Sequence, residues 1–428
     1  MNPFTFGNPI KEPERFIGRK AEIRQIVNRL LSSAHESTSL IGERRIGKTS
    51  LLYHLAHPQV GAGLGLTSDK FCLVYVDFQG LTDITPTRFW QRVLKKMSRS
   101  VCDESLRPSI EALSNQDVID LFDLEDLFQA SQEKGLTTVL LMDEFEYVTE
   151  NPNFKNDFFG GLRALAIHHG VALVPSTRRE LVDLCHSDEI KGSPFFNIFA
   201  NVVLRPFNRA EADEMLESYT RDGELAFAPK EKDFIWELGG GYPIFVQMAG
   251  HYHLEGRLQG LTGEALANYT ISNFEAQADA HYTYLWSHCT ESEKISLLIL
   301  LTLAMQKPSK KTVANAENLS QLRARTPQDL AVLVRRGLVG ERDGTYVIFS
   351  PSFQRWIRNE ILAAPGEEQS ETTAESWLKG GGHEEVRNAK TVLPRFKQKY
   401  WPLVGAFIKD LTIKVAASVT VELMKSIP

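Results

Sequence analysis

Short apolar runs alternate with segments of helical periodicity over the first two hundred residues of the chain. The runs are brief and rich in β-branched, aliphatic and aromatic residues, which is typical of strands buried on both faces of a parallel sheet. They cover residues 37–41, 71–78, 138–142, 170–175 and 201–207. The longest segment between them, 86–132, has apolar residues at helical spacing. Strands that alternate with helices predict an α/β fold with a parallel sheet and right-handed crossovers.

The pattern becomes wholly helical after residue 207. The sequence Gly239-Gly240-Gly241-Tyr242-Pro243 interrupts two helices, with glycine as the C-cap and proline at the start of the next helix. A later apolar helix follows the N-cap signal at 290–293. Further on, Arg342-Asp343-Gly344 lies between two β-rich runs and predicts a hairpin. Helices followed by a hairpin predict a winged helix over 284–362.

These patterns predict six parts of the chain. They are an N-terminal arm at 1–15, a sheet domain at 16–207, a helical lid at 208–283, a winged-helix domain at 284–362, a flexible acidic linker at 363–385 and an amphipathic helical tail at 386–428. Apolar residues in the tail trace a helical stripe from Leu403 to Val419. A stripe on a tethered tail needs a partner, which is another copy, a target protein, a membrane surface or the body of the same chain.

Composition narrows the class of protein. The chain has 428 residues, of which 43% are hydrophobic and 24% charged, as in ordinary globular proteins. A formal net charge of -6 argues against coating nucleic acid through bulk charge but leaves room for a local basic patch. The four cysteines are scattered, and neither a signal sequence nor an apolar run of about 20 residues is found. We therefore expect a cytoplasmic protein.

The clearest chemical motif lies between the first strand and the helix that follows it. Residues 42–50 read Gly-Glu-Arg-Arg-Ile-Gly-Lys-Thr-Ser, which is the phosphate-binding loop G-x-x-x-x-G-K-[ST]. Gly42 and Gly47 let successive backbone N–H groups surround a phosphate. Lys48 is expected to contact the β- and γ-phosphates, and Thr49 to complete a Mg²⁺ shell. The loop begins a helix, whose N-terminus favours anions.

A second motif ends the third apolar run. Asp143 follows four apolar residues, at the end of the strand where open α/β sheets bind their ligands, and is expected to hold Mg²⁺ through water. Glu144 is the candidate to polarise the attacking water. One strand further on, Ser176 or Thr177 is a candidate for contact with the γ-phosphate or the water. Arg178 is either a γ-phosphate sensor or a surface guanidinium at a strand end.

Five motifs together resemble the STAND and archaeal-type ATPase branch of the AAA+-like P-loop proteins. They are FIGRKAEI at 16–23, GERRIGKTSLL at 42–52, LLMDEFE at 140–146, STR at 176–178 and GGYP at 240–243. The resemblance implies an ASCE-type sheet and ATP or ADP held between the sheet domain, the lid and the winged helix. Arg19 and Pro243 are expected near the adenine. The alternative for Arg19 is that its Gly-Arg turn is a plain helix N-cap. The binding loop is expected to include Arg45, Ile46 and Ser50.

The function predicted from these residues is a molecular switch that binds ATP and hydrolyses it slowly with Mg²⁺. Lys48, Glu144 and Arg178 are the catalytic candidates, and Thr49 and Asp143 the metal ligands. A nucleotide-dependent homo-oligomer and a protein partner for the tail are expected, with membrane contact of the tail as an open alternative.

The competing prediction is a DNA-binding ATPase that resembles origin-recognition proteins. Basic residues of the predicted winged helix would then contact phosphates, whereas the simpler interpretation is a solvated face on a packing module. They are Lys294, Lys307, Lys310, Lys311, Arg323, Arg325, Arg335, Arg336, Arg342, Arg355 and Arg358.

Overall fold

The computed structural model describes residues 2–221, 225–304, 313–322 and 325–362, which form two compact units. Residues 7–205 make up one of them, which we call the sheet unit. The described parts of 2–6 and 206–362 make up the other, which we call the helical unit. The predicted linker and tail, 363–428, lie outside the described residues.

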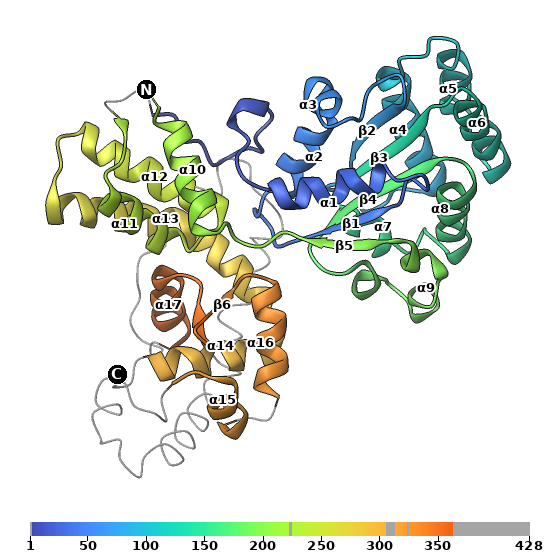
Figure 1. The fold of residues 1–428 in the computed structure, drawn as a ribbon. Coiled ribbons are helices and arrows are strands. Elements are labelled where there is room, and N and C mark those ends of the chain that lie inside the picture. The colour runs from blue at the N-terminus through green and yellow to red at the C-terminus, as the bar shows by residue number, and fades with distance from the viewer. Residues whose placement is uncertain (1, 222–224, 305–312, 323–324, 363–428) are drawn as a thin grey trace. The chain divides into compact units, whose positions relative to one another are not determined.

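The sheet unit contains five parallel strands in the order β2-β3-β4-β1-β5 (Figure 1). Their bounds are Thr38–Ile41 (β1), Phe71–Asp77 (β2), Thr137–Asp143 (β3), Val171–Thr177 (β4) and Ala200–Val203 (β5). Every residue of β3 and β4 is buried, which fits central strands covered on both faces. The predicted parallel sheet is therefore confirmed. Strand register places Asp77 beside Asp143 and Ile41 beside Thr177, so the carboxyl ends of four strands meet at one edge.

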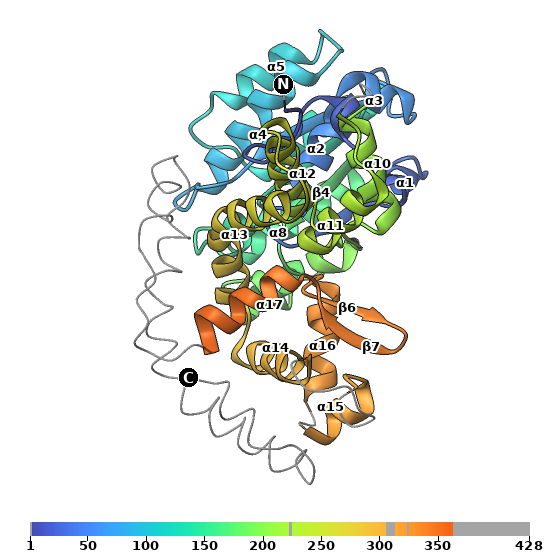
Figure 2. The ribbon, with the colours of Figure 1, turned by 90° about the vertical axis from the view of Figure 1, so that its left-hand side faces the viewer.

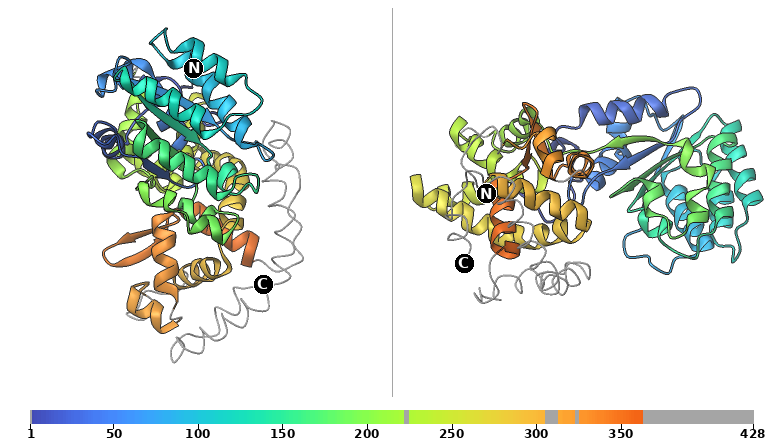
Figure 3. Two further views of the ribbon diagram at one scale, coloured as in Figure 1. Left: turned by 90° about the vertical axis from the view of Figure 1, so that its right-hand side faces the viewer. Right: turned by 90° about the horizontal axis from the view of Figure 1, so that it is seen from below.

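Helices cover both faces of the sheet (Figure 3), and alternate residues of each strand point to opposite faces. Val74 and Leu140 belong to a core that also contains residues of α4, α5, α6 and α8. Leu73 and Tyr75, on either side of Val74 in β2, face the other way. A Cβ at Gly61 of α3 would lie 3.2 Å from Leu73, and the rings of Tyr53 in α2 and Tyr75 are 4.4 Å apart. The sheet is thus sandwiched between helices, as its uninterrupted apolar strands predict.

The helices of the sheet unit are mostly short connections between strands. Their bounds are Pro13–Arg15 (η1), Lys20–Leu30 (α1), Lys48–Ala56 (α2), Pro58–Gly63 (α3), Pro86–Ser100 (α4), Arg107–Ser114 (α5), Leu121–Glu133 (α6), Glu146–Thr149 (α7), Asn156–His168 (α8), Leu181–Leu184 (η2), Asp188–Lys191 (α9) and Pro194–Ile198 (η3). The segment predicted as helical from its periodicity, 86–132, corresponds to α4, α5 and most of α6.

The helical unit begins with four helices and ends with a hairpin between shorter ones (Figure 2). Its elements are Arg209–Tyr219 (α10), Pro229–Gly239 (α11), Pro243–Leu258 (α12), Gly263–Ser287 (α13), Glu291–Ala304 (α14), Ala316–Leu322 (α15), Thr326–Arg335 (α16), Val339–Arg342 (β6), Thr345–Ile348 (β7), Pro351–Ile357 (α17) and the π-helical turn Arg358–Leu362 (η5). Phe4 of the N-terminal arm is buried here against Tyr219 and Phe227.

The glycine-rich corner between α11 and α12 is fixed by contacts across the helical unit. Gly240 caps α11 in the left-handed region at φ 59°, and Pro243 starts α12, as the sequence predicts. A Cβ on Gly240 would collide with the side chain and carbonyl of Phe349. The buried Tyr242 hydroxyl donates to the Arg336 carbonyl at 2.9 Å. The corner therefore fastens the first helices to the segment around the hairpin.

The hairpin β6–β7 is antiparallel and turns at Asp343 and Gly344, which have φ values of 51° and 70°. Two central residues with positive φ are the type I′ turn that an Asp-Gly pair favours. At the start of α14 the Thr290 hydroxyl and the Glu293 carboxylate cap each other's backbone N–H groups, as the signal at 290–293 predicts. The assignment of this region as a winged helix stays a prediction. Within the described ranges, no helix is long and apolar enough to cross a membrane.

Candidate functional site

The phosphate-loop sequence connects β1 to α2 at the carboxyl edge of the sheet (Figure 1). Gly47 is left-handed at φ 106° and caps α2, so a side chain would be strained there. Gly42 is required for a different reason from the one that the sequence suggests. Its backbone angle is not unusual, but an added Cβ would lie 2.8 Å from the Ile46 side chain and 3.1 Å from Leu204. Backbone conformation thus requires glycine at position 47, and close packing requires it at position 42.

Lys48 lies inside the loop with only 5% of its surface exposed. Its ammonium donates to the carbonyls of Gly42 at 2.8 Å and Glu43 at 3.4 Å. These two carbonyls hold the cation over the loop, where a bound phosphate would compete for it. Thr49, the next residue, is half-buried in the first turn of α2.

Arg19, expected near the adenine, is buried and connects the loop to the end of β5. Its guanidinium donates to the carbonyls of Ile46 at 3.0 Å and Arg205 at 2.7 Å, and pairs with Glu22 at 3.3 Å. These bonds make Arg19 a support for the loop backbone. Its predicted contact with a nucleotide stays a prediction.

A segment of the N-terminal arm contacts two other residues of the predicted binding loop. The Ile10 amide donates to the Ser50 hydroxyl at 3.0 Å, and the Arg45 guanidinium donates to the Gly7 carbonyl at 3.0 Å. Arg45 has a left-handed backbone at φ 67°. Burial and the neighbouring Arg44 lower the pKa of Arg45, while Glu144 acts in the opposite direction. Residues 7–10 therefore lie along the loop, a contact that the sequence does not reveal.

The carboxylate of Asp143 is buried at the end of β3 and accepts hydrogen bonds from three groups. The Tyr75 hydroxyl donates to Oδ2 at 3.0 Å, whereas the Ser176 hydroxyl and the Glu144 amide donate to Oδ1. Ser176 comes from β4, which lies between β3, which ends at Asp143, and β1, which the loop with Lys48 follows. The serine proposed for phosphate contact thus positions the predicted metal ligand. Burial, followed by the charge of Asp143, raises the pKa of Tyr75, which keeps the phenol a donor.

The three predicted catalytic residues, Lys48, Glu144 and Arg178, all interact electrostatically with the carboxylate of Glu146. Glu146 is 5% exposed, and its Oε2 atom is buried with no hydrogen-bond partner. Burial first and the charge of Glu144 second raise the pKa of Glu146 to about 8.

Arg178 extends from the end of β4 toward the short helix α7. Its guanidinium lies 2.6 Å from Glu150 and 3.9 Å from Glu146. The cation expected to sense a γ-phosphate is thus held by carboxylates in this structure. Thr177, the other polar residue at this strand end, donates to the Arg179 carbonyl at 2.6 Å.

Several residues of the site could not be identified from the sequence. Tyr75 carries no motif, and its hydroxyl reaches Asp143 from a strand about seventy residues away. Glu146 ends the motif LLMDEFE, but nothing in the motif indicates its burial beside Arg178. Asp77 had a signal that could have found it, because like Asp143 it follows an apolar run. Burial raises the pKa of Asp77, and the charge of Asp143 adds to this rise. Pro243 belongs to the helical unit, so its contact with adenine stays a prediction.

The oxygen donors at this edge suit Mg²⁺, which binds through one or two protein oxygens and completes its shell with water and phosphate. Thr49 would supply a hydroxyl and Asp143 a carboxylate. In the described ranges no cluster of three or more His, Cys, Asp or Glu residues could hold a metal by itself.

Comparison with known proteins gives a family and a fold. The family model described as Novel STAND NTPase 2 matches residues 19–302. A Walker-type ATPase of Pyrococcus abyssi has a similar structure, with a TM-score of 0.53 and 17% identity over 82% of this chain and 99% of that one. The ORC2 protein of Aeropyrum pernix, solved as ADPNP-ADP complexes, has a TM-score of 0.52 and 14% identity over 84% and 96% of the chains. These identities support likeness of fold alone. The search of curated proteins found no match.

Proposed function

Because the chain belongs to the novel STAND NTPase 2 family of P-loop NTPases, we propose that it is an ATP-dependent molecular switch with slow Mg²⁺-dependent hydrolysis. The observation that carries the proposal is the position of three buried charges at the carboxyl edge of the sheet: Lys48 in the loop, Asp143 at the end of β3, and Glu146 at 3.9 Å from Arg178. Charge of both signs at the carboxyl edge of a parallel sheet is what phosphoryl transfer requires.

In the proposed reaction the protein acts mainly by positioning and charge. The Lys48 ammonium would leave the carbonyls of Gly42 and Glu43 for phosphate oxygens. Mg²⁺, held by Thr49 and through water by Asp143, would neutralise charge on the phosphates. Glu144 would orient the attacking water and accept its proton.

Arg178 supports the switch part of the proposal. A guanidinium held by Glu150 and Glu146 can exchange these carboxylates for a γ-phosphate and return to them after hydrolysis. The nucleotide state would then alter the contacts of α7, which begins at Glu146 and has Glu150 as its C-cap. We expect this change to control two events. One is assembly into a homo-oligomer, and the other is binding of a protein partner to the tail. A cytoplasmic location accords with four free cysteines.

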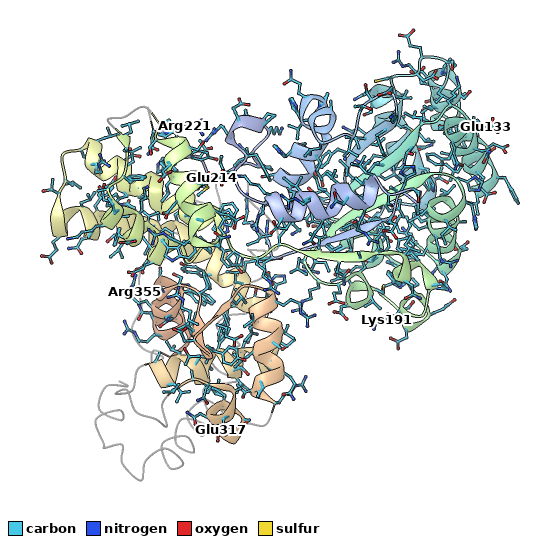
Figure 4. All side chains as sticks on the ribbon, in the orientation of Figure 1. Glu133, Lys191, Glu214, Arg221, Glu317 and Arg355 are labelled. Atoms are coloured by element: carbon cyan, nitrogen blue, oxygen red, sulfur yellow. The ribbon has the colours of Figure 1, made fainter. Side chains whose placement is uncertain are left out.

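The DNA-binding alternative loses part of its support in the helical unit. Arg336 is buried and pairs with Glu293 at 2.7 Å, and Arg355, labelled in Figure 4, pairs with Glu275 at 2.7 Å. Lys294 pairs with Glu291 and Arg325 with Asp329. Four of the basic residues proposed for phosphate contact are therefore neutralised within the unit. Lys307, Lys310, Lys311 and Arg323 lie outside the described residues.

Two substitutions separate nucleotide binding from hydrolysis. Lys48→Ala should weaken ATP binding at least about tenfold in calorimetry, because it removes the buried cation of the loop. Glu144→Gln should bind ATP like the wild type but hydrolyse it about a hundredfold or more slowly, since the amide cannot accept a proton. Lys70→Ala and Glu111→Gln change exposed residues of the same unit and serve as controls. Hydrolysis at the wild-type rate by Glu144→Gln would refute the assigned base.

A further inference from the structure

One face of α4 carries five exposed cations beside a groove of about 660 Å³. Apart from the adjacent pair at 95 and 96, they recur at intervals of three or four residues, so they share one side of the helix. The apolar residues Phe89, Trp90, Val93, Leu94 and Met97 occupy the other side and are buried. The loop at 80–84, which follows β2, forms the opposite wall. The cations of this surface, which we call the basic groove, are Arg88, Arg92, Lys95, Lys96 and Arg99.

The charge of the basic groove is only partly compensated within the sheet unit, where the Asp77 carboxylate attracts Arg92 and Lys96 electrostatically. Among the described residues, none of its five cations forms an ion pair with a carboxylate, and their one side-chain hydrogen bond runs from the Arg92 guanidinium to the Asp77 carbonyl at 3.1 Å. Asp83 is the acidic residue in its lining. By contrast, four basic residues of the helical unit are paired with carboxylates. Five cations against the carboxylates of Asp77 and Asp83 leave the surface with a net positive charge, which favours an anionic partner.

A surface of opposite charge adjoins the basic groove. Gln91, which lines the groove, donates to the Gln116 carbonyl at 2.9 Å. Beyond Gln116, Val118 and Phe122 are 72% and 75% exposed, the highest values among the exposed large hydrophobic residues of the described chain. The exposed acids Asp117, Asp126 and Glu133 accompany them, and Glu133 is labelled on α6 in Figure 4. We call Asp117, Val118, Phe122, Asp126 and Glu133 the acidic ridge.

We propose that the basic groove of one copy of this chain binds the acidic ridge of a second copy. Charge complementarity carries the inference, because a copy supplies both the anions that the groove lacks and the cations that the ridge lacks. Burial of Val118 and Phe122 would add apolar area, which exposed patches of this kind commonly provide at interfaces. Two complementary patches side by side suit a two-fold dimer, in which each groove faces the partner's ridge.

Nucleic acid is a less suitable occupant of the basic groove. A phosphate backbone would be attracted by the five cations but repelled by Asp117 and its acidic neighbours just past Gln116. It would also leave Val118 and Phe122 exposed. A second copy would pair the cations of the groove with acids and would cover the apolar residues of the ridge.

Charge reversal on each surface tests the proposal. One full-length variant carries Arg88→Glu and Lys95→Glu, another carries Asp117→Lys and Asp126→Lys, and a third carries all four changes. These side chains are exposed, lie outside the nucleotide site and are not part of the capping box that begins α6. Sedimentation equilibrium with ADP and with ATP measures the dimer dissociation constant, and circular dichroism confirms that each variant folds.

Each two-site variant should raise the dissociation constant at least about tenfold, because like charges then face each other. The four-site variant, and a mixture of the two two-site variants, should regain the affinity of the wild type to within about threefold. High salt should weaken the wild-type dimer. A wild-type monomer at about 100 µM, near the weak end of specific association, would overturn the proposal, as would failure of the four-site variant to recover. Binding of duplex DNA that is lost with Arg88→Glu and Lys95→Glu and not recovered would assign the groove to nucleic acid instead.

Discussion

Asp143 depends on neighbours that reach it from two other strands. Tyr75 of β2 and Ser176 of β4 donate to its two carboxylate oxygens, so the side chain is held in one orientation before a nucleotide binds. Fixed donors and acceptors cost no reorganisation when charge develops, which is how electrostatic positioning accelerates phosphoryl transfer. The predicted metal ligand is thus part of a hydrogen-bond network that spans the sheet.

Glu146 gives the sheet unit a measurable dependence on pH. Its pKa is raised from 4.5 to about 8, so between these values the folded state binds a proton that the unfolded state releases. The free energy of unfolding therefore falls as pH rises through this interval. Glu146→Gln removes the titrating group and should stabilise the protein by roughly 1–3 kcal/mol more at pH 8 than at pH 5.5. Thermal unfolding at the two pH values measures this difference.

Glu150→Gln is the matched control for this prediction. Glu150 also pairs with Arg178, but it is 46% exposed and lies at the end of the same short helix. Its substitution should change the melting temperature by a similar amount at both pH values. Equal pH dependence in Glu146→Gln and the wild type would show that Glu146 titrates as an ordinary carboxyl.

At the level of single residues, the sequence predicts the backbone-determined part of the site better than the side-chain network. Lys48 and Asp143 can be assigned because a loop motif and a strand end fix their positions. Tyr75 and Glu146 cannot, because their contacts depend on strand order and on side-chain direction across distant segments. Arg19 has a motif, but its bonds to the Ile46 and Arg205 carbonyls follow only from the fold.

Among the secondary-structure elements, those with local signals are predicted well. The Asp343-Gly344 turn and the Gly240-to-Pro243 corner both appear where their residues require them. The order of the strands is a different matter, because apolar runs of similar composition do not specify their neighbours. Short pieces such as α7 and α9 also lack enough residues for a periodic pattern.

The corner between α11 and α12 should be a sensitive point of the helical unit to an added methyl group. Gly240→Ala combines a left-handed backbone with a collision against Phe349, and should destabilise the unit by about 3 kcal/mol or more. Gly344→Ala has the same backbone constraint but no atom within 4 Å, so it should cost only about 1–2 kcal/mol. Urea unfolding of both variants measures the difference. Similar losses would mean that Phe349 moves aside without cost.

For the whole molecule, the switch proposal requires that ATP and ADP stabilise different states. A ligand shifts such an equilibrium only by its difference in affinity for the two states. In the sheet unit, the candidate source of that difference is Arg178, because Glu146 and Glu150 hold its guanidinium and would compete with a γ-phosphate for it.

The variant Glu144→Gln makes this coupling measurable, because it should hold ATP without consuming it. Its mass and sedimentation coefficient with ATP should differ from those with ADP, whereas Lys48→Ala should give the same values with either nucleotide. Adding Arg178→Ala to Glu144→Gln should abolish the difference while ATP remains bound, since the loop and Lys48 are unchanged. An ATP-dependent change that persists without Arg178 would place the sensor elsewhere at the carboxyl edge of the sheet. Identical behaviour of Glu144→Gln with ATP and ADP would instead identify the protein as a hydrolase whose nucleotide state does not control assembly.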